Sequence, residues 1–193
     1  TLILNDYADI IDFNLGCPDK DILANKSGGF LSKHPEQIER LLKPLIENSK
    51  KPVTAKIRTG WNNEDITVLK QIKILEDLGV DAIAIHGRTV KQKYQGKADW
   101  DLIKQAKERS NVPIIGNGDI TEPGTAKFRL EQSKVDFVMI GRAALGNPFI
   151  FQQADYLLKN NKNQPKAINR DKQRAFLRFA ELYKQNKEQF KIS

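Results

Sequence analysis

The feature that most constrains the fold is a unit that recurs five times along the chain. In each unit, a short run of mostly β-branched and apolar residues ends in a polar or glycine-containing motif. The polar ends of the runs fall at Cys17, Lys56, His86, Asn117 and Gly141, at intervals of 39, 30, 31 and 24 residues. These intervals are typical of successive βα units. The repeat therefore predicts an α/β fold with a parallel sheet that helices cover.

The predicted strands occupy residues 10–14, 52–58, 81–85, 112–115 and 135–140. Between them, apolar residues recur at helical spacing, as in the stripe formed by Ile38, Leu42 and Ile46. A stripe of this period predicts a helix that packs one face against the sheet. Helices are therefore expected to connect the strands.

Composition narrows the classes of protein that this chain can belong to. Of its 193 residues, 39% are hydrophobic and 29% are charged, and the net charge is +8. No stretch has the length and apolar content of a membrane span or a signal peptide. One cysteine and two histidines exclude a disulfide framework, a zinc finger and an iron–sulfur ligand set. We therefore expect a cytoplasmic protein with no metal and no membrane partner, whose basic surface suits a polyanion such as RNA or simply keeps it soluble.

The chain is predicted to contain two parts. Residues 1–160 carry the five repeated units, and a polar linker begins near Asn160. Residues 161–193 are expected to start a helical domain, because residues 170–190 form one basic amphipathic pattern. The apolar face of that helix can pack in a bundle, whereas its lysines and arginines can bind RNA.

Charged and polar side chains recur at the carboxyl ends of the predicted strands. In (β/α) barrels this end carries the functional residues. Because the residues occupy the same structural place in consecutive units, we expect them to form one site. They are Asn14, Cys17, Lys56, Arg58, His86, Arg88, Asn117, Asp119 and Arg142.

The last two units contain a candidate phosphate site. Asn117-Gly118-Asp119 ends the fourth strand motif, and Gly141-Arg142 ends the fifth. Glycines let the backbone approach an anion, and an arginine adds a fork of donors. Tight turns also use glycine, so these short motifs are informative mainly through their order and position.

Three further residues suggest roles in the same site. Lys56 interrupts an apolar strand, where it can place a cation against a cofactor ring or an anionic intermediate. Alternatively, it lies on an edge strand and points to solvent. His86 can donate to a ring carbonyl or a phosphate, or serve a structural role. Cys17 is either a small buried apolar residue or, at the mouth of a strand near cations, a group that exchanges a proton.

Five motifs in this order resemble those of the tRNA-dihydrouridine synthases. The similarity extends from about Ile10 to Phe151 and weakens in the helical tail. The motifs read DFNLGCP (12–18), KIRTGW (56–61), HGRT (86–89), GNGDI (116–120) and IGRAALGNP (140–148).

The resemblance implies a flavoprotein that combines an FMN-binding TIM barrel with a helical domain, and that binds tRNA with both. In such enzymes NADPH reduces FMN, and the reduced flavin delivers a hydride to C6 of a uracil that has left its stack. A cysteine then protonates C5, which yields 5,6-dihydrouridine.

The same resemblance assigns roles to residues of this chain. Cys17 corresponds to the proton donor, and Lys56 and His86 correspond to residues that hold the flavin ring. The phosphate-binding stretches correspond to Asn117, Gly118, Asp119, Gly141 and Arg142. The residues expected to contact the substrate are Asn14, Arg58 and Arg88.

The chain departs from this family in one respect, because the family barrel has eight strands and only five strand motifs occur here. They correspond to about strands 4 to 8. We therefore expect an incomplete (β/α)8 TIM-barrel type fold, either as a fragment of a longer product or as a shortened relative. A complete barrel typically takes about 250 residues, and an open sheet exposes two edges. We therefore expect this chain to be only weakly stable on its own.

Two other functions fit the same motifs. The first is another FMN-dependent barrel oxidoreductase acting on a small molecule such as dihydroorotate, which would share the phosphate-binding motifs. The second is a non-catalytic RNA-binding fragment that has lost its cofactor. Flavin retention and salt-sensitive tRNA binding separate these alternatives.

Overall fold

The computed structural model describes residues 2–164 and 169–190, and its centre is one parallel sheet of five strands. The strands lie side by side in chain order, each parallel to its neighbours. This order confirms the predicted succession of βα units. The strands are β1 (Ile11–Asn14), β2 (Val53–Arg58), β5 (Ala82–His86), β6 (Ile114–Asn117) and β7 (Phe137–Met139).

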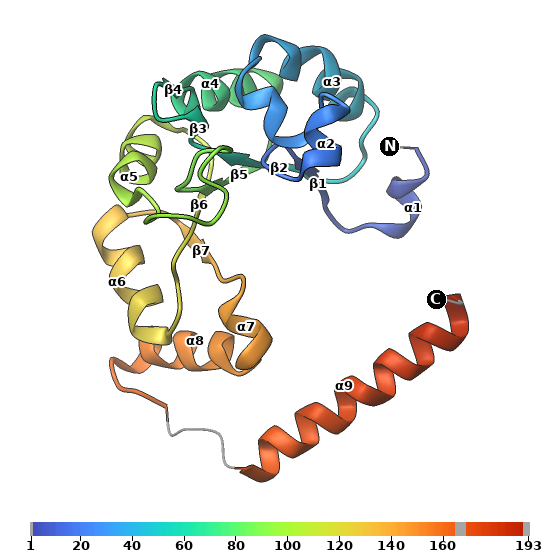
Figure 1. Cartoon of the computed structure of the whole chain (residues 1–193), viewed down its shortest axis with the longest axis vertical. Helices are drawn as coiled ribbons and strands as arrows, with labels where there is room; N and C mark the ends of the chain where they lie inside the picture. Colours follow the sequence, from blue (N-terminus) through green and yellow to red (C-terminus); the bar gives the residue numbers. More distant parts are fainter. Residues whose placement is uncertain (1, 165–168, 191–193) are drawn as a thin grey trace.

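Helices cover the outer, convex face of the sheet (Figure 1). The strand residues that face them are fully buried, among them Ile57, Ile83 and Ile85. Helix residues such as Ile38 and Ile103 complete the same apolar core. The helices are α3 (Glu36–Glu47), α4 (Val68–Leu78), α5 (Trp100–Arg109) and α6 (Pro123–Ser133).

The opposite, concave face carries the alternate strand residues, because side chains along a strand point to opposite sides in turn. Lys56, Arg58 and His86 lie on this face near the carboxyl ends of β2 and β5. Farther along, Phe137 of β7 is 62% exposed. Within the described residues the sheet is open, with β1 and β7 as its edges.

Several connecting elements were not predicted from the sequence. After β2 the chain forms a small hairpin of β3 (Gly60–Asn62) and β4 (Asp65–Ile66). The remaining elements are short helices and one longer one that flank the sheet. They are α1 (Leu4–Tyr7), α2 (Lys20–Ala24), the 3-10 turn η1 (Gly28–Ser32), α7 (Ala143–Gly146) and α8 (Ile150–Asn160).

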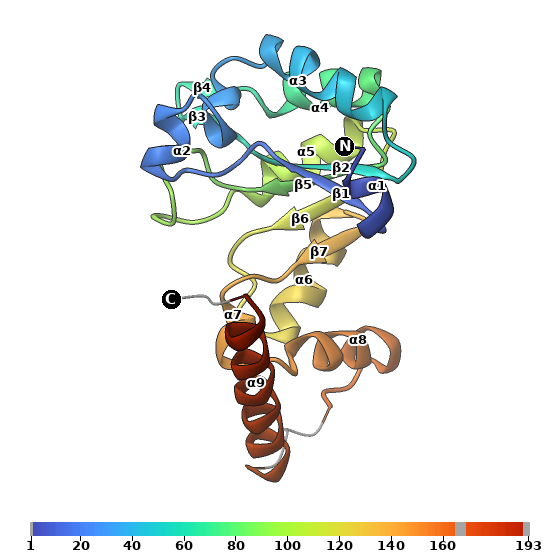
Figure 2. The same ribbon diagram turned by 90° about the vertical axis from the view of Figure 1, so that its right-hand side faces the viewer.

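The predicted basic helix is present as α9 (Asn169–Phe190) and stands apart from the sheet in both views (Figure 2). Its apolar residues Phe176, Phe179 and Tyr183 are 60–68% exposed. The expected second part, residues 161–193, includes residues 165–168 and 191–193, which lie outside the described residues. No helix within the described ranges combines the length and the apolar content needed to cross a bilayer.

Candidate functional site

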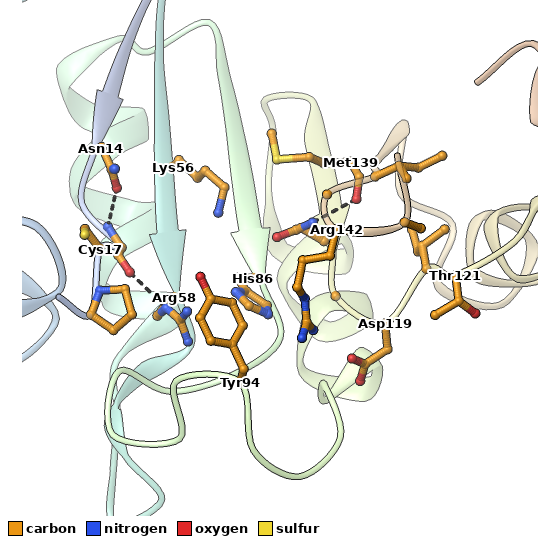
Figure 3. A pocket seen from close by; sticks show the side chains of 18 residues that line it. Asn14, Cys17, Lys56, Arg58, His86, Tyr94, Asp119, Thr121, Met139 and Arg142 are labelled. Atoms are coloured by element: carbon orange, nitrogen blue, oxygen red, sulfur yellow. Dashed lines mark hydrogen bonds between the residues drawn. The ribbon is translucent and has the colours of Figure 1, made fainter. Parts of the chain in front are cut away.

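A pocket of about 730 Å³ opens at the carboxyl ends of the strands (Figure 3). Of the eleven residues predicted from the sequence, ten line it, and the exception is Arg88. The ten are Asn14, Cys17, Lys56, Arg58, His86, Asn117, Gly118, Asp119, Gly141 and Arg142. The strand ends thus bring together residues that are up to 128 positions apart in the sequence, from Asn14 to Arg142.

The register of the sheet places the strand-borne side chains next to one another. Asn14 pairs with Lys56, Arg58 pairs with His86, and His86 pairs with Asn117. Paired residues of parallel strands point to the same face. The row of polar side chains at the pocket is therefore a direct result of strand order and register.

Burial and neighbouring cations shift the ionisation of these groups. Burial lowers the pKa of Lys56, and the adjacent Arg58 lowers it further. Burial also lowers the pKa of His86 to about 3, an effect reinforced by Arg58, Lys56 and Arg88 and opposed by Asp119. His86 is consequently a neutral imidazole at neutral pH.

Arg58 joins the turn after β1 to the loop after β5. Its Nε donates to the Gly16 carbonyl at 2.9 Å, and its Nη1 donates at 2.9 Å to the carbonyls of Thr89 and Lys93. The side chain is 3% exposed but still contributes to the pocket wall. Arg58 thereby holds the Cys17 turn against the pocket.

Tyr94 is a pocket residue that the sequence analysis missed. Its ring lies between two guanidinium groups, 5.9 Å from that of Arg58 and 4.8 Å from that of Arg142. It is 58% exposed and projects from the loop between β5 and α5 into the pocket opening (Figure 3). The sequence signal was a tyrosine among Lys91, Lys93 and Lys97 just after the HGRT motif, in a loop rather than at a strand end.

The far side of the pocket has the features of an anion site. Gly118 has φ +131°, and a Cβ there would collide with Ala98 and press on the His86 ring, so only glycine suits this position. Space is open around Gly141, and the exposed Arg142 follows it. Asn117 donates from Nδ2 to the Met139 carbonyl at 2.8 Å, which fixes β6 to β7 beside these glycines.

Asp119 is the only acidic residue among those that line the pocket, and its carboxylate is already engaged. It accepts from Arg88 Nη2 and from the Ala98 N–H, both at 2.7 Å. Burial raises the pKa of Asp119, but these two hydrogen bonds and the charge of Arg88 outweigh it and lower the pKa overall. The pocket therefore presents a net positive charge from Lys56, Arg58 and Arg142.

Arg88, which was predicted to contact the substrate, does not line the pocket. It is 3% exposed and lies behind the pocket wall. Its Nε donates to the Gln95 carbonyl at 3.0 Å, and its Nη2 donates to the Gly96 carbonyl at 2.6 Å and to Asp119. These partners are internal, and through them Arg88 supports the pocket wall, while its contact with a substrate stays a prediction.

Cys17 lies half-buried in the pocket wall, beside Pro18. Its carbonyl accepts from the Gly29 N–H at 2.9 Å, and a Cβ on Gly28, which has φ +57°, would lie 3.0 Å from the Cys17 Cβ. Two glycines in the η1 turn therefore allow the close approach that supports the cysteine. No cluster of three or more metal-ligating side chains occurs in the described ranges.

Comparison with known proteins gives one consistent family match. The family model described as "Dihydrouridine synthase (Dus)" matches residues 2–193. The chain is 43% identical to "tRNA-dihydrouridine synthase B" of Vibrio vulnificus over 158 residues, 82% of this chain and 49% of that protein. It is 44% identical to the protein of the same name from Vibrio parahaemolyticus over 153 residues, 79% of this chain and 48% of that protein. The chain thus spans about half the length of these relatives.

Proposed function

This chain belongs to the dihydrouridine synthase family, and we propose that it contributes to the reduction of uridine in tRNA to 5,6-dihydrouridine. The observation that carries the proposal is the positively charged pocket, which gathers a cysteine, a half-buried lysine and a neutral histidine from separate strand ends. Such a pocket suits a cofactor that has an anionic group and a polar ring. Because the chain spans about half of its relatives, this activity is proposed for the protein of which these residues are a part.

The pocket residues fit FMN, with NADPH as the reductant. The open space at Gly141 leaves room for a phosphate close to the backbone, and Arg142 supplies a cation beside it. Lys56 would lie against the electron-rich end of the flavin ring, and His86 would donate to it. A bound reduced flavin supplies the hydride that saturates the C5–C6 bond of uracil.

Cys17 would complete the reduction by donating the proton from Sγ to C5 of uracil. The negative charge that remains on sulfur is stabilised by the cationic pocket, where Arg58 lies on the adjoining strand end. Asn14 would orient the base. Its Oδ1 accepts from the Gly16 N–H at 3.0 Å, which leaves Nδ2 as a donor to a uracil carbonyl.

The proposed substrate is a base within tRNA rather than a free small molecule. A uridine must leave its stack to enter the pocket, at an expected cost of a few kcal/mol. The net charge of +8 supports contacts to the phosphate backbone. The basic helix α9 is proposed to start the helical part that takes part in this contact.

The test is dihydrouridine formation by this chain in the presence of FMN, NADPH and an unmodified tRNA transcript, measured by mass spectrometry of the digested RNA. Cys17→Ala is the matched variant, because it removes the proton donor and leaves the cations that would bind the flavin. Dihydrouridine that depends on Cys17 supports the proposal. A chain that binds FMN and reduces a free pyrimidine, but neither binds nor reduces tRNA, would establish the small-molecule alternative instead.

A further inference from the structure

Arg88 is a buried side chain that the proposed reaction does not use directly. Its guanidinium reaches the loop after β5, Asp119 two residues after the end of β6, and the ring of His86. The Nη1 atom lies 3.4 Å from His86 Nε2, in addition to the contacts with Asp119, Gln95 and Gly96 described above.

The contact between Arg88 and His86 determines where the imidazole carries its proton. An arginine donates hydrogen bonds and accepts none, so His86 Nε2 must offer its lone pair. A neutral imidazole has one N–H, which is then on Nδ1. His86 Nδ1 makes no hydrogen bond with the described residues, so this N–H remains available to a ligand in the pocket.

We propose that Arg88 is a positioning residue that holds His86 as the Nδ1–H tautomer, so that the ring presents a donor to a bound ligand. The pocket would then select a ligand with an acceptor atom at this point, such as a ring carbonyl or ring nitrogen. The nature of that acceptor rests on the proposed function, whereas the tautomer itself does not.

The same guanidinium also supports the loop that carries Tyr94. It binds the carbonyls of Gln95 and Gly96, the two residues that follow the tyrosine. Gly96 has φ +65°, a conformation that glycine adopts readily, so the turn closes onto Arg88 without strain. One side chain thus fixes both the orientation of His86 and the position of the aromatic ring at the pocket opening.

Nitrogen-15 NMR of the imidazoles tests this proposal directly. The chain has two histidines, and His34 serves as the internal reference because it is partly exposed and contacts Glu36. In ligand-free wild-type protein near neutral pH, we expect a protonated Nδ1 and an unprotonated Nε2 for His86. An Nε2–H tautomer, or the mixture that free imidazole shows, would overturn the proposal.

Substitution of Arg88 separates positioning from general structural support. In Arg88→Met, we expect His86 to shift toward the Nε2–H tautomer and FMN affinity to fall by about tenfold, the size of one lost hydrogen bond. Arg88→Lys, which retains the charge, should restore part of the Nδ1–H population. Arg109→Met, at an exposed position on α5, is the control and should change neither readout.

The outcomes of these experiments separate the role of Arg88 from the proposed binding of flavin. A folded Arg88→Met protein that keeps the Nδ1–H tautomer would overturn the proposal, and if this variant does not fold, the wild-type spectrum still decides it. Since that spectrum needs no cofactor, its result is independent of flavin binding. A chain with the Nδ1–H tautomer that fails to bind FMN would contradict the proposed function and leave the role of Arg88 intact.

Discussion

The two faces of the sheet differ although the same strands form both. On the convex face, Ile57 and Ile85 are fully buried beneath helices. One position away along each strand, Lys56, Arg58 and His86 face the concave side and the pocket. Because side chains alternate along a strand, a shift of one residue separates the part that stabilises the fold from the part that binds a ligand.

The two faces also differ in their energetics. Apolar burial on the convex face stabilises the folded state, by roughly 25 cal/mol per Å² of apolar surface removed from water. The concave face withdraws ionisable groups from water, which lowers the pKa of Lys56, Arg58 and His86. Hydrogen bonds from Arg58 to three carbonyls offset part of that cost. Substitutions on the two faces should therefore affect different properties.

The largest effect on stability is expected on the convex face. Ile85→Ala should lower the free energy of unfolding by about 2–5 kcal/mol, because it leaves a cavity in the buried core. The control is Phe137→Ala on the concave face, where the ring is 62% exposed, and we expect a change within about 0.5 kcal/mol. Urea denaturation measures both, and equal losses would show that the concave face also contributes a packed core.

Stability should also depend on pH through His86. The unfolded chain takes up a proton near pKa 6.5, whereas the folded chain resists protonation until about pH 3. The contribution of His86 to the free energy of unfolding is therefore fully present above pH 6.5. It is lost as pH falls from 6.5 toward 3, by about 1.4 kcal/mol per pH unit. His86→Gln should remove this slope in the range above the carboxylate titrations. An unchanged slope in the variant would mean that another group titrates.

Lys56 should matter for binding more than for stability. Lys56→Met is expected to weaken FMN binding by about tenfold or more, because it removes a charge-assisted contact. Its unfolding free energy should stay equal or rise, since a partly desolvated cation is replaced by an apolar chain of similar length. Lys159→Met on α8 is the control, because that lysine is exposed and pairs with Asp155. If Lys56→Met lowers the unfolding free energy but leaves FMN affinity unchanged, Lys56 serves stability and not flavin binding.

The smallest effect is expected at the pocket rim. Arg142 is exposed, so Arg142→Ala should weaken FMN binding by only about two- to fivefold. High salt should remove most of this difference, because it screens exposed charges more strongly than buried ones. FMN titrations at low and high salt measure it. A loss that is large and independent of salt would mean that Arg142 is buried in the complex.

The sequence was sufficient to predict the five strands and the row of polar side chains at their ends. Periodicity and motif spacing carry that information, because a strand's position fixes which residues reach its carboxyl end. Lys56 and His86 were identified in this way, and both line the pocket.

Contacts made by loops were beyond the same reasoning. Tyr94 reaches the pocket because Arg58 and Arg88 hold its loop through backbone carbonyls, and such carbonyls leave no pattern in the sequence. Arg88 lies outside the pocket lining for a related reason: its spacing after β5 suits the pocket, but hydrogen bonds to residues 95, 96 and 119 draw it inward. The β3–β4 hairpin was missed because its strands are only three and two residues long.

We propose that the cations and glycines of the concave pocket form a phosphate site for a flavin. The most direct test is to titrate this chain with FMN and with riboflavin, which lacks the phosphate, and to follow the quenching of flavin fluorescence. We expect that FMN binds, that riboflavin binds at least about tenfold more weakly, and that high salt narrows the difference. A folded chain that binds neither flavin, or binds both equally, would contradict it.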